Sequence, residues 1–340
     1  MKMHRNFDVK TIIRRTVATL TVGAALFSVS ACGAKSADKT EKKTDTSQKT
    51  TAKDPLTVVA SVNQWGSLAQ EIGGDHVKVT SIINSSNVEA HDYEPSTAEI
   101  AQLTAANIAV VNGGHYDEWA TKALSSAKSV QSVNAASIIG ASESDNPHLW
   151  FSSDARKAVA ESLKKTYAQL LPASKDYFQK QYDAWLKSET ELDNTMNEFK
   201  NKYADTPYAA TESVAYYLYS DLGLKDVTPE GYANASANES EPTAADLQAF
   251  QSIIEGHQIK FLVNNPQESS DATNMLTGTA GKSDIPVVNI TEQIPSQYTT
   301  LHAWIKALVE NLTATLDTGV NPDTTVYEQS EHSDHDHDHD

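Results

Sequence analysis

The chain has 340 residues, of which 27 are Lys or Arg and 45 are Asp or Glu, so its formal net charge is −18. This acidity argues against a nucleic-acid-binding protein, which would need a basic surface to contact phosphates. A single cysteine excludes an internal disulfide framework. The hydrophobic content of 39% is enough for one or two folded domains, and the excess of acid suits a cationic ligand.

Residues 1–31 have the pattern of a bacterial export signal. Basic residues precede residues 16–31, an uncharged and mostly small or apolar stretch. It ends in Val29-Ser30-Ala31 directly before Cys32, which is typical of a lipoprotein cleavage site. We therefore expect the mature protein to begin at a lipidated Cys32 and to be anchored on the extracytoplasmic face of the cell membrane. An ordinary signal peptide followed by a structural cysteine is the alternative.

Both ends of the mature chain have compositions that cannot bury a core. Residues 32–54 contain mainly Lys, Thr, Ser and Asp and predict a flexible tether. Residues 327–340 form a tail that is rich in His and Asp over residues 332–340, and this pattern predicts a disordered metal chelator. An expression tag is the alternative explanation. The histidines of the tail are His332, His335, His337 and His339.

The first folded segment, residues 55–150, alternates apolar strands with helical stretches. The expected strands are 56–62, 77–83 and 108–111, and the expected helices are 66–72 and 97–106. Alternation of this kind predicts βαβ units and a parallel sheet.

Residues 151–204 predict a helical spacer, after which the α/β pattern returns in residues 205–326. Within the spacer, Pro172 separates a helix over 155–170 from a long amphipathic helix with aromatic and apolar residues at steps of three or four. The expected later strands are 208–211, 259–263 and 287–291, and the expected helices are 213–222, 244–255 and 298–316. The fold class is therefore α/β, with two lobes and parallel sheets.

Two histidines and two glutamates fall where ligands gather in α/β proteins, at strand ends or at a lobe junction. His91 lies in a loop soon after a predicted strand, and His148 directly precedes the spacer. Glu212 and Glu292 each follow a predicted strand. Singly, each has an ordinary interpretation, such as a loop histidine or an acid that complements a helix start. Together they predict a four-ligand site for Zn²⁺ or Mn²⁺.

Six motifs carry a resemblance to a known family. They are HDYEPS at 91–96, NGGHYDEW at 112–119, NPHLWFS at 146–152, ATESVAYYLYSDLGL at 210–224, TPEGYANA at 228–235 and ITEQIP at 290–295. With them, residues 55 to about 318 resemble the metal-binding solute-binding lipoproteins of bacterial zinc/manganese ABC importers, the cluster A-I (cluster 9) family. The resemblance implies two Rossmann-like lobes joined by a long rigid helix.

The resemblance also implies a metal site of four side chains between the lobes. Its histidine positions fall on His91 and His148. The third position, which is His in many zinc-binding members and Glu in many manganese-binding members, is Glu212. The fourth is usually Asp, whereas this chain has Glu292.

Three further residues are weaker candidates for metal binding. Asp284 and Glu94 are alternatives to Glu292. His115 lies in a loop where the family generally has no ligand, so we expect at most an auxiliary role for it.

By this resemblance, we expect the chain to be a monomeric, non-enzymatic component of an importer. It would capture Zn²⁺, or alternatively Mn²⁺, and deliver it to an ABC permease whose ATPase is a separate chain; the sequence has no P-loop motif. The His-rich tail favours zinc, whereas two carboxylates also suit manganese. A surface adhesin and a secreted zinc hydrolase are alternatives. The absence of H-E-x-x-H and G-x-S-x-G motifs counts against the hydrolase.

Overall fold

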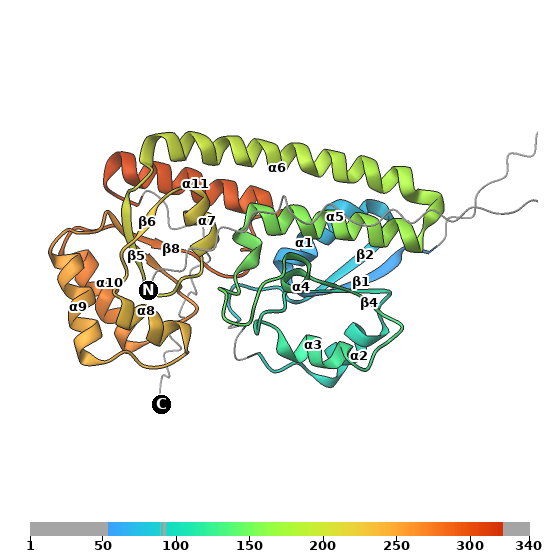
Figure 1. Cartoon of the computed structure of the whole chain (residues 1–340), viewed down its shortest axis with the longest axis horizontal. Helices are drawn as coiled ribbons and strands as arrows, with labels where there is room; N and C mark the ends of the chain where they lie inside the picture. The colour runs from blue at the N-terminus through green and yellow to red at the C-terminus, as the bar shows by residue number, and fades with distance from the viewer. Residues whose placement is uncertain (1–53, 89, 91–92, 322–340) are drawn as a thin grey trace, which may run out of the picture. The chain divides into compact units, whose positions relative to one another are not determined.

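The computed structural model describes residues 54–88, 90 and 93–321, all within one compact unit. The described residues form two four-stranded sheets in which every strand pairing is parallel. The strand orders are β2-β1-β3-β4 and β6-β5-β7-β8. We call these sheets and their flanking helices the N-terminal and C-terminal lobes (Figure 1). The prediction of two parallel α/β lobes is confirmed.

The N-terminal lobe builds its sheet from short strands separated by helices. Its elements are β1 (Leu56–Val62), α1 (Asn63–Gly73), β2 (Val77–Ile83), α2 (Thr97–Ala105), β3 (Ile108–Val111), α3 (Glu118–Leu124), β4 (Gln131–Asn134) and α4 (Ala135–Ile139). Strand β1 is buried on both faces, because Val58 and Ala60 share a core with α1 and α5, whereas Val59 packs with Leu103 of α2. A sheet covered on both faces needs nearly continuous apolar strands, which explains why this strand could be predicted.

The C-terminal lobe has the same arrangement. Its elements are β5 (Pro207–Ala210), α7 (Tyr216–Asp221), β6 (Lys225–Asp226), α8 (Glu230–Ala237), α9 (Ala244–Glu255), β7 (Phe261–Asn264), α10 (Asp271–Lys282), β8 (Val287–Asn289) and α11 (Leu301–Thr318). One face of its sheet packs with α7 and α11, and the other with α9 and α10. The first of these cores continues into the N-terminal lobe, where Phe151 contacts Trp304 with ring centroids 5.3 Å apart.

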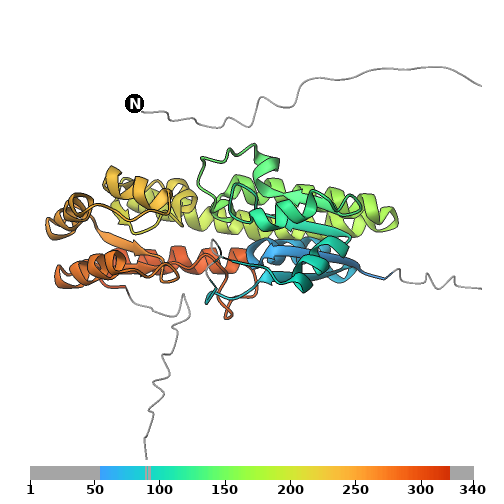
Figure 2. The ribbon, with the colours of Figure 1, turned by 90° about the horizontal axis from the view of Figure 1, so that it is seen from below.

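A pair of antiparallel helices connects the lobes. Helix α5 (Ser153–Leu170) ends before the short turn Pro172–Ser174, and α6 (Lys175–Tyr203) follows with 29 residues, a length of about 43 Å. Helix α6 packs against α1, α5 and α11, and Figure 1 shows it running beside α5 and α11. Figure 2 shows α11, in red, reaching from the C-terminal lobe toward the blue N-terminal strands. The predicted long helix is confirmed.

Some elements differ from the sequence prediction. Strands β4 and β6 were not predicted: β4 has the sequence Gln-Ser-Val-Asn with only Val133 buried, and β6 has two exposed residues. Helix α7 begins at Tyr216 rather than at residue 213. No described helix is both long and apolar enough to cross a bilayer.

Candidate metal site

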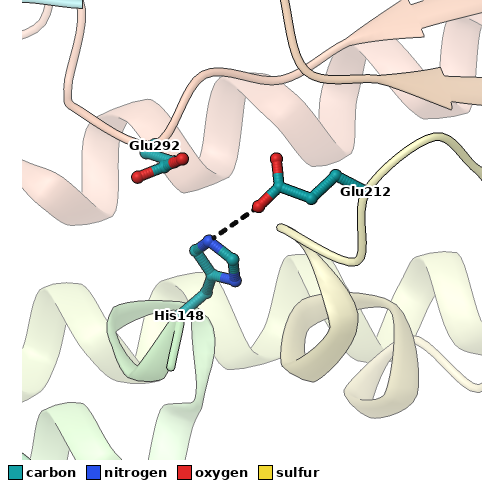
Figure 3. Close-up of side chains that lie close together, drawn as sticks. All are labelled: His148, Glu212 and Glu292. Carbon is teal, nitrogen blue, oxygen red and sulfur yellow. Dashed lines mark ion pairs between the residues drawn. The ribbon is translucent and has the colours of Figure 1, made fainter. Parts of the chain in front are cut away.

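Three of the four predicted ligands come together in one buried group. His148, Glu212 and Glu292 each offer a ligand atom, and these atoms lie within 4.8 Å of one another. The residues are only 2%, 9% and 0% exposed. Figure 3 shows the imidazole and the two carboxylates pointing toward one another from separate segments. Within residues 54–88, 90 and 93–321, this is the only group of three or more His, Cys, Asp or Glu residues arranged in this way.

The C-terminal sheet supplies both carboxylates because of its strand order. Strands β5, β7 and β8 are neighbours and parallel, so their carboxyl ends meet at one edge, which is where ligands bind in such sheets. Glu212 follows β5 by two residues and Glu292 follows β8 by three. Asn265 directly follows the strand between them, β7.

His148 belongs to the N-terminal lobe, and Asn146 fixes its ring. The Asn146 Oδ1 atom accepts hydrogen bonds from the His148 backbone N, at 2.9 Å, and from ring Nδ1, at 3.0 Å. Asn146 is held in turn by its Nδ2, which donates to the Ser213 carbonyl and hydroxyl oxygens at 2.8 Å each. With Nδ1 donating, a neutral imidazole has its lone pair on Nε2, the nitrogen that lies 3.2 Å from Glu212 Oε1.

The carboxylates are held by buried donors from both lobes. Asn265 Nδ2 donates to Glu212 Oε2 at 2.6 Å and to Glu292 Oε1 at 3.2 Å. The Tyr116 hydroxyl, from the N-terminal lobe, donates to Glu292 Oε2. The backbone N of Glu292 donates to Gln267 Oε1 at 2.7 Å. A set of one imidazole and two carboxylates, each oriented by hydrogen bonds, has the donor chemistry of a site for a divalent transition metal.

The loop that carries Glu292 is also tied to helix α1. Asn63 Nδ2 donates to the Ile294 carbonyl at 2.9 Å, and the Ile294 backbone N donates back to Asn63 Oδ1 at 3.0 Å. Gln64 Nε2 donates to the carbonyl of Glu292 itself. The position of Glu292 therefore depends on contacts with the opposite lobe.

Several predicted metal-binding residues lie outside the described residues. These are His91, Cys32 and the tail histidines His332, His335, His337 and His339.

The remaining candidates lie apart from the buried group. His115 is 52% exposed and forms ion pairs with Glu118 and Glu143; hydrogen bonding to Glu118 raises the pKa of its imidazole. Glu94 and Asp284 are both exposed.

Sequence reasoning did not identify the residues that orient the ligands. Tyr116, Asn146 and Asn265 are ordinary polar residues in loops. Asn265 had one available signal, because it follows a predicted strand just as Glu212 and Glu292 do.

The fold and the buried group together define a two-lobed α/β protein with a candidate metal site between its lobes. The sequence model of the family named zinc-uptake complex component A, periplasmic (ZnuA), matches residues 58–315. The chain belongs to this family.

Known relatives are distant in sequence. The chain is 23% identical over 261 residues to the zinc-binding lipoprotein AdcA of Streptococcus pneumoniae (strain ATCC BAA-255 / R6), covering 70% of this chain but only 51% of AdcA. It thus spans about half the length of that relative. It is 24% identical over 259 residues to the manganese-binding lipoprotein MntA of Bacillus subtilis (strain 168), covering 72% of this chain and 79% of MntA.

Solved structures share the fold. The laminin-binding protein Lmb of Streptococcus agalactiae, described as bifunctional with adhesin and metal-transporting activity, superposes with a TM-score of 0.65 at 21% identity. The superposition covers 77% of this chain and 100% of Lmb.

Proposed function

We propose that this protein is the solute-binding component of a metal ABC importer and carries Zn²⁺ between its lobes, with Mn²⁺ as the alternative cargo. The observation that carries the proposal is the buried convergence of His148 from one lobe with Glu212 and Glu292 from the other, within 4.8 Å. Membership of the zinc-uptake family supports it. Ligands from two lobes can release the ion through a fairly small opening motion between the lobes, and this suits transport better than permanent storage.

The ligand set in this proposal has four members. His91 joins His148, Glu212 and Glu292, since it occupies the first histidine position of the family pattern. Two imidazoles and two carboxylates accept either metal, and most such sites bind Zn²⁺ more tightly than Mn²⁺. Relatives with the names zinc-binding and manganese-binding lipoprotein both match the chain.

The proposal also covers the location of the protein and its partners. Lipidated Cys32 anchors a monomer on the extracytoplasmic face of the membrane, and residues 32–54 tether the body. The body comprises residues 55–150, the spacer 151–204 and residues 205–326. It delivers the metal to a permease with a separate ATPase and has no catalytic role.

The test is a competitive titration with Zn²⁺ and Mn²⁺ combined with metal content measured by mass spectrometry. The complete chain is purified in detergent with the four tail histidines replaced by alanine, so that only the body binds metal. We expect the body to bind one equivalent of metal. In His148→Ala and Glu292→Ala the affinity for that metal should fall more than about 100-fold, because removing a ligand should cost more than removing a residue that only orients a ligand. His115→Ala, a change outside the buried group, is the control.

A body that holds no stoichiometric metal would overturn the proposal. The adhesin alternative would then take first place. It would be supported if a strain that lacks this protein grew equally well at low and high metal supply.

The tail has a separate role in this proposal: it collects metal and passes it to the site between the lobes. Deleting residues 332–340 should leave the affinity of that site unchanged but reduce uptake when zinc is scarce. Radioactive zinc uptake by cells that carry the deletion measures this. Unchanged uptake would exclude a collecting role for the tail.

A further inference from the structure

Asn265 contacts both carboxylates of the site. It is 1% exposed, and its Nδ2 donates to Glu212 Oε2 at 2.6 Å and to Glu292 Oε1 at 3.2 Å. Its Oδ1 accepts a hydrogen bond from the Gln267 backbone N at 3.0 Å. Because this backbone group can only donate, the amide is oriented with its NH₂ group toward the carboxylates.

Tyr116 holds the opposite oxygen of Glu292. Its hydroxyl is directed at Glu292 Oε2, while Gln293 Nε2 donates to the same hydroxyl at 3.1 Å. The hydroxyl proton is therefore assigned to Glu292. The ring of Tyr116 is fixed by edge contact with Trp150, at a centroid distance of 5.0 Å. Both oxygens of Glu292 and one oxygen of Glu212 thus accept hydrogen bonds from rigid, buried donors.

These donors limit how the carboxylates can bind a metal. A carboxylate binds through two oxygens only if both turn their lone pairs toward the ion. A buried donor resists that rotation, because the rotation would leave the donor buried without its hydrogen-bond partner. Carboxylates that each give one oxygen keep the number of ligand atoms low, which suits four-coordinate Zn²⁺, whereas Mn²⁺ prefers six oxygen-rich ligands.

We infer that Asn265 and Tyr116 determine the metal specificity of the site, an inference that rests on the proposed function. They hold Glu212 and Glu292 as one-oxygen ligands and thereby favour Zn²⁺ over Mn²⁺. Neither residue contacts the metal in this inference; both act through the carboxylates.

The test uses Asn265→Ala and Tyr116→Phe in the complete chain with the tail histidines replaced. Tyr116→Phe removes a hydroxyl but keeps the ring, so it tests the inference even if Asn265→Ala does not fold. Zn²⁺ and Mn²⁺ compete for each variant, and X-ray absorption of the metal-loaded proteins counts the ligand atoms. We expect the ratio of Zn²⁺ to Mn²⁺ affinity to fall about 10-fold in each variant, with one additional oxygen bound to the metal.

Asn264→Ala is the matched control. Asn264 precedes Asn265 and also makes two side-chain hydrogen bonds, with Asn289 at 2.8 Å and with Thr211 at 3.3 Å. Its replacement should leave the affinity ratio and the number of ligand atoms unchanged.

Two results would overturn the inference, and they differ from each other. Equal losses of affinity for both metals, with the same number of ligand atoms, would mean that Asn265 and Tyr116 only support the structure. If instead the unaltered protein binds neither metal, the proposed function itself fails.

Discussion

The side chains of the candidate metal site are each oriented by hydrogen bonds with neighbouring residues. Asn146 accepts from Nδ1 of His148 and is itself fixed by Ser213, a residue of the other lobe. It therefore sets both the tautomer and the direction of the imidazole.

We expect Asn146→Ala to reduce zinc affinity about 10- to 100-fold although no ligand is removed. The reason is that the imidazole would lose the acceptor that keeps its proton on Nδ1. Titration with Zn²⁺ measures the effect, with Asn311→Ala as the control because Asn311 lies on α11 and bonds Asn321 instead. Equal affinities in Asn146→Ala and the unaltered protein would contradict this role.

The three residues of the buried group could be predicted, but the residues that orient them could not. His148, Glu212 and Glu292 lie beside strand ends or the spacer, positions that are visible in the sequence. Tyr116 reaches Glu292 across 176 positions of the chain. No local pattern in the sequence encodes such a distant hydrogen bond, so only the folded chain reveals it.

At the scale of elements, a buried ion pair joins the two helices of the spacer. Arg156 on α5 and Glu189 on α6 are 1% and 0% exposed, with Nη2 to Oε1 at 2.6 Å. Arg156 Nη1 also donates to the Trp150 carbonyl at 3.0 Å. This pair therefore links the long helix to the segment that contains His148.

We expect Glu189→Ala to destabilise the fold by about 3–5 kcal/mol, because it leaves the Arg156 charge buried without its partner. Denaturant unfolding measures the change. Glu310→Ala breaks an exposed pair with Lys306 on one helix and should cost no more than about 0.5 kcal/mol. Similar small losses in both variants would show that water reaches Arg156 when Glu189 is removed.

A second pair joins α1 and α11 and should make stability depend on pH. His302 Nδ1 lies 3.2 Å from Glu71 Oε2, and the Glu71 carboxylate raises the pKa of His302 above 6.5 against the opposing effect of burial. A raised pKa in the folded state favours folding when the imidazole is protonated. The contribution is complete below about pH 6.5 and is lost as pH rises through the raised value.

Unfolding of the unaltered protein and of His302→Gln, measured from pH 5 to pH 9, checks this expectation. The stability difference should be largest at the acidic end, at no more than about 1 kcal/mol because the pair is partly exposed, and should shrink with rising pH. Introducing Glu71→Gln into both proteins should remove the trend. A difference that grows with pH would refute the assignment.

At the scale of the whole molecule, the site joins two lobes that share one continuous core. A metal bound by residues of both lobes would bind the folded chain and not the unfolded one. Zn²⁺ at 100 times its dissociation constant should therefore add about 2.7 kcal/mol to the free energy of unfolding, and a chelator should remove this gain.

Thermal unfolding with and without Zn²⁺ measures this gain in the protein whose tail histidines are replaced. His148→Ala should show little shift, since it lacks the ligand from the N-terminal lobe. The same unfolding temperature with Zn²⁺ and with chelator in the unaltered site would argue against a metal that bridges the lobes.

The elements that could be predicted from the amino-acid sequence are those with a local signal. Strands β1, β2 and β3 and helix α9 have the predicted bounds, because buried strands are continuously apolar and helices repeat their apolar residues every three or four positions. The two lobes and the long helix α6 follow from the same patterns.

The remaining features could not be predicted, because each depends on a partner that is remote in the chain. Strand β4 is polar and exists because Gln131 through Asn134 pair with Ile108 through Val111 of β3. The strand order and the packing of one lobe on the other bring His148, Glu212 and Glu292 close together. They also place Asn265 between the two carboxylates. Periodicity specifies which face of an element is buried, but the packed core specifies which side chains meet.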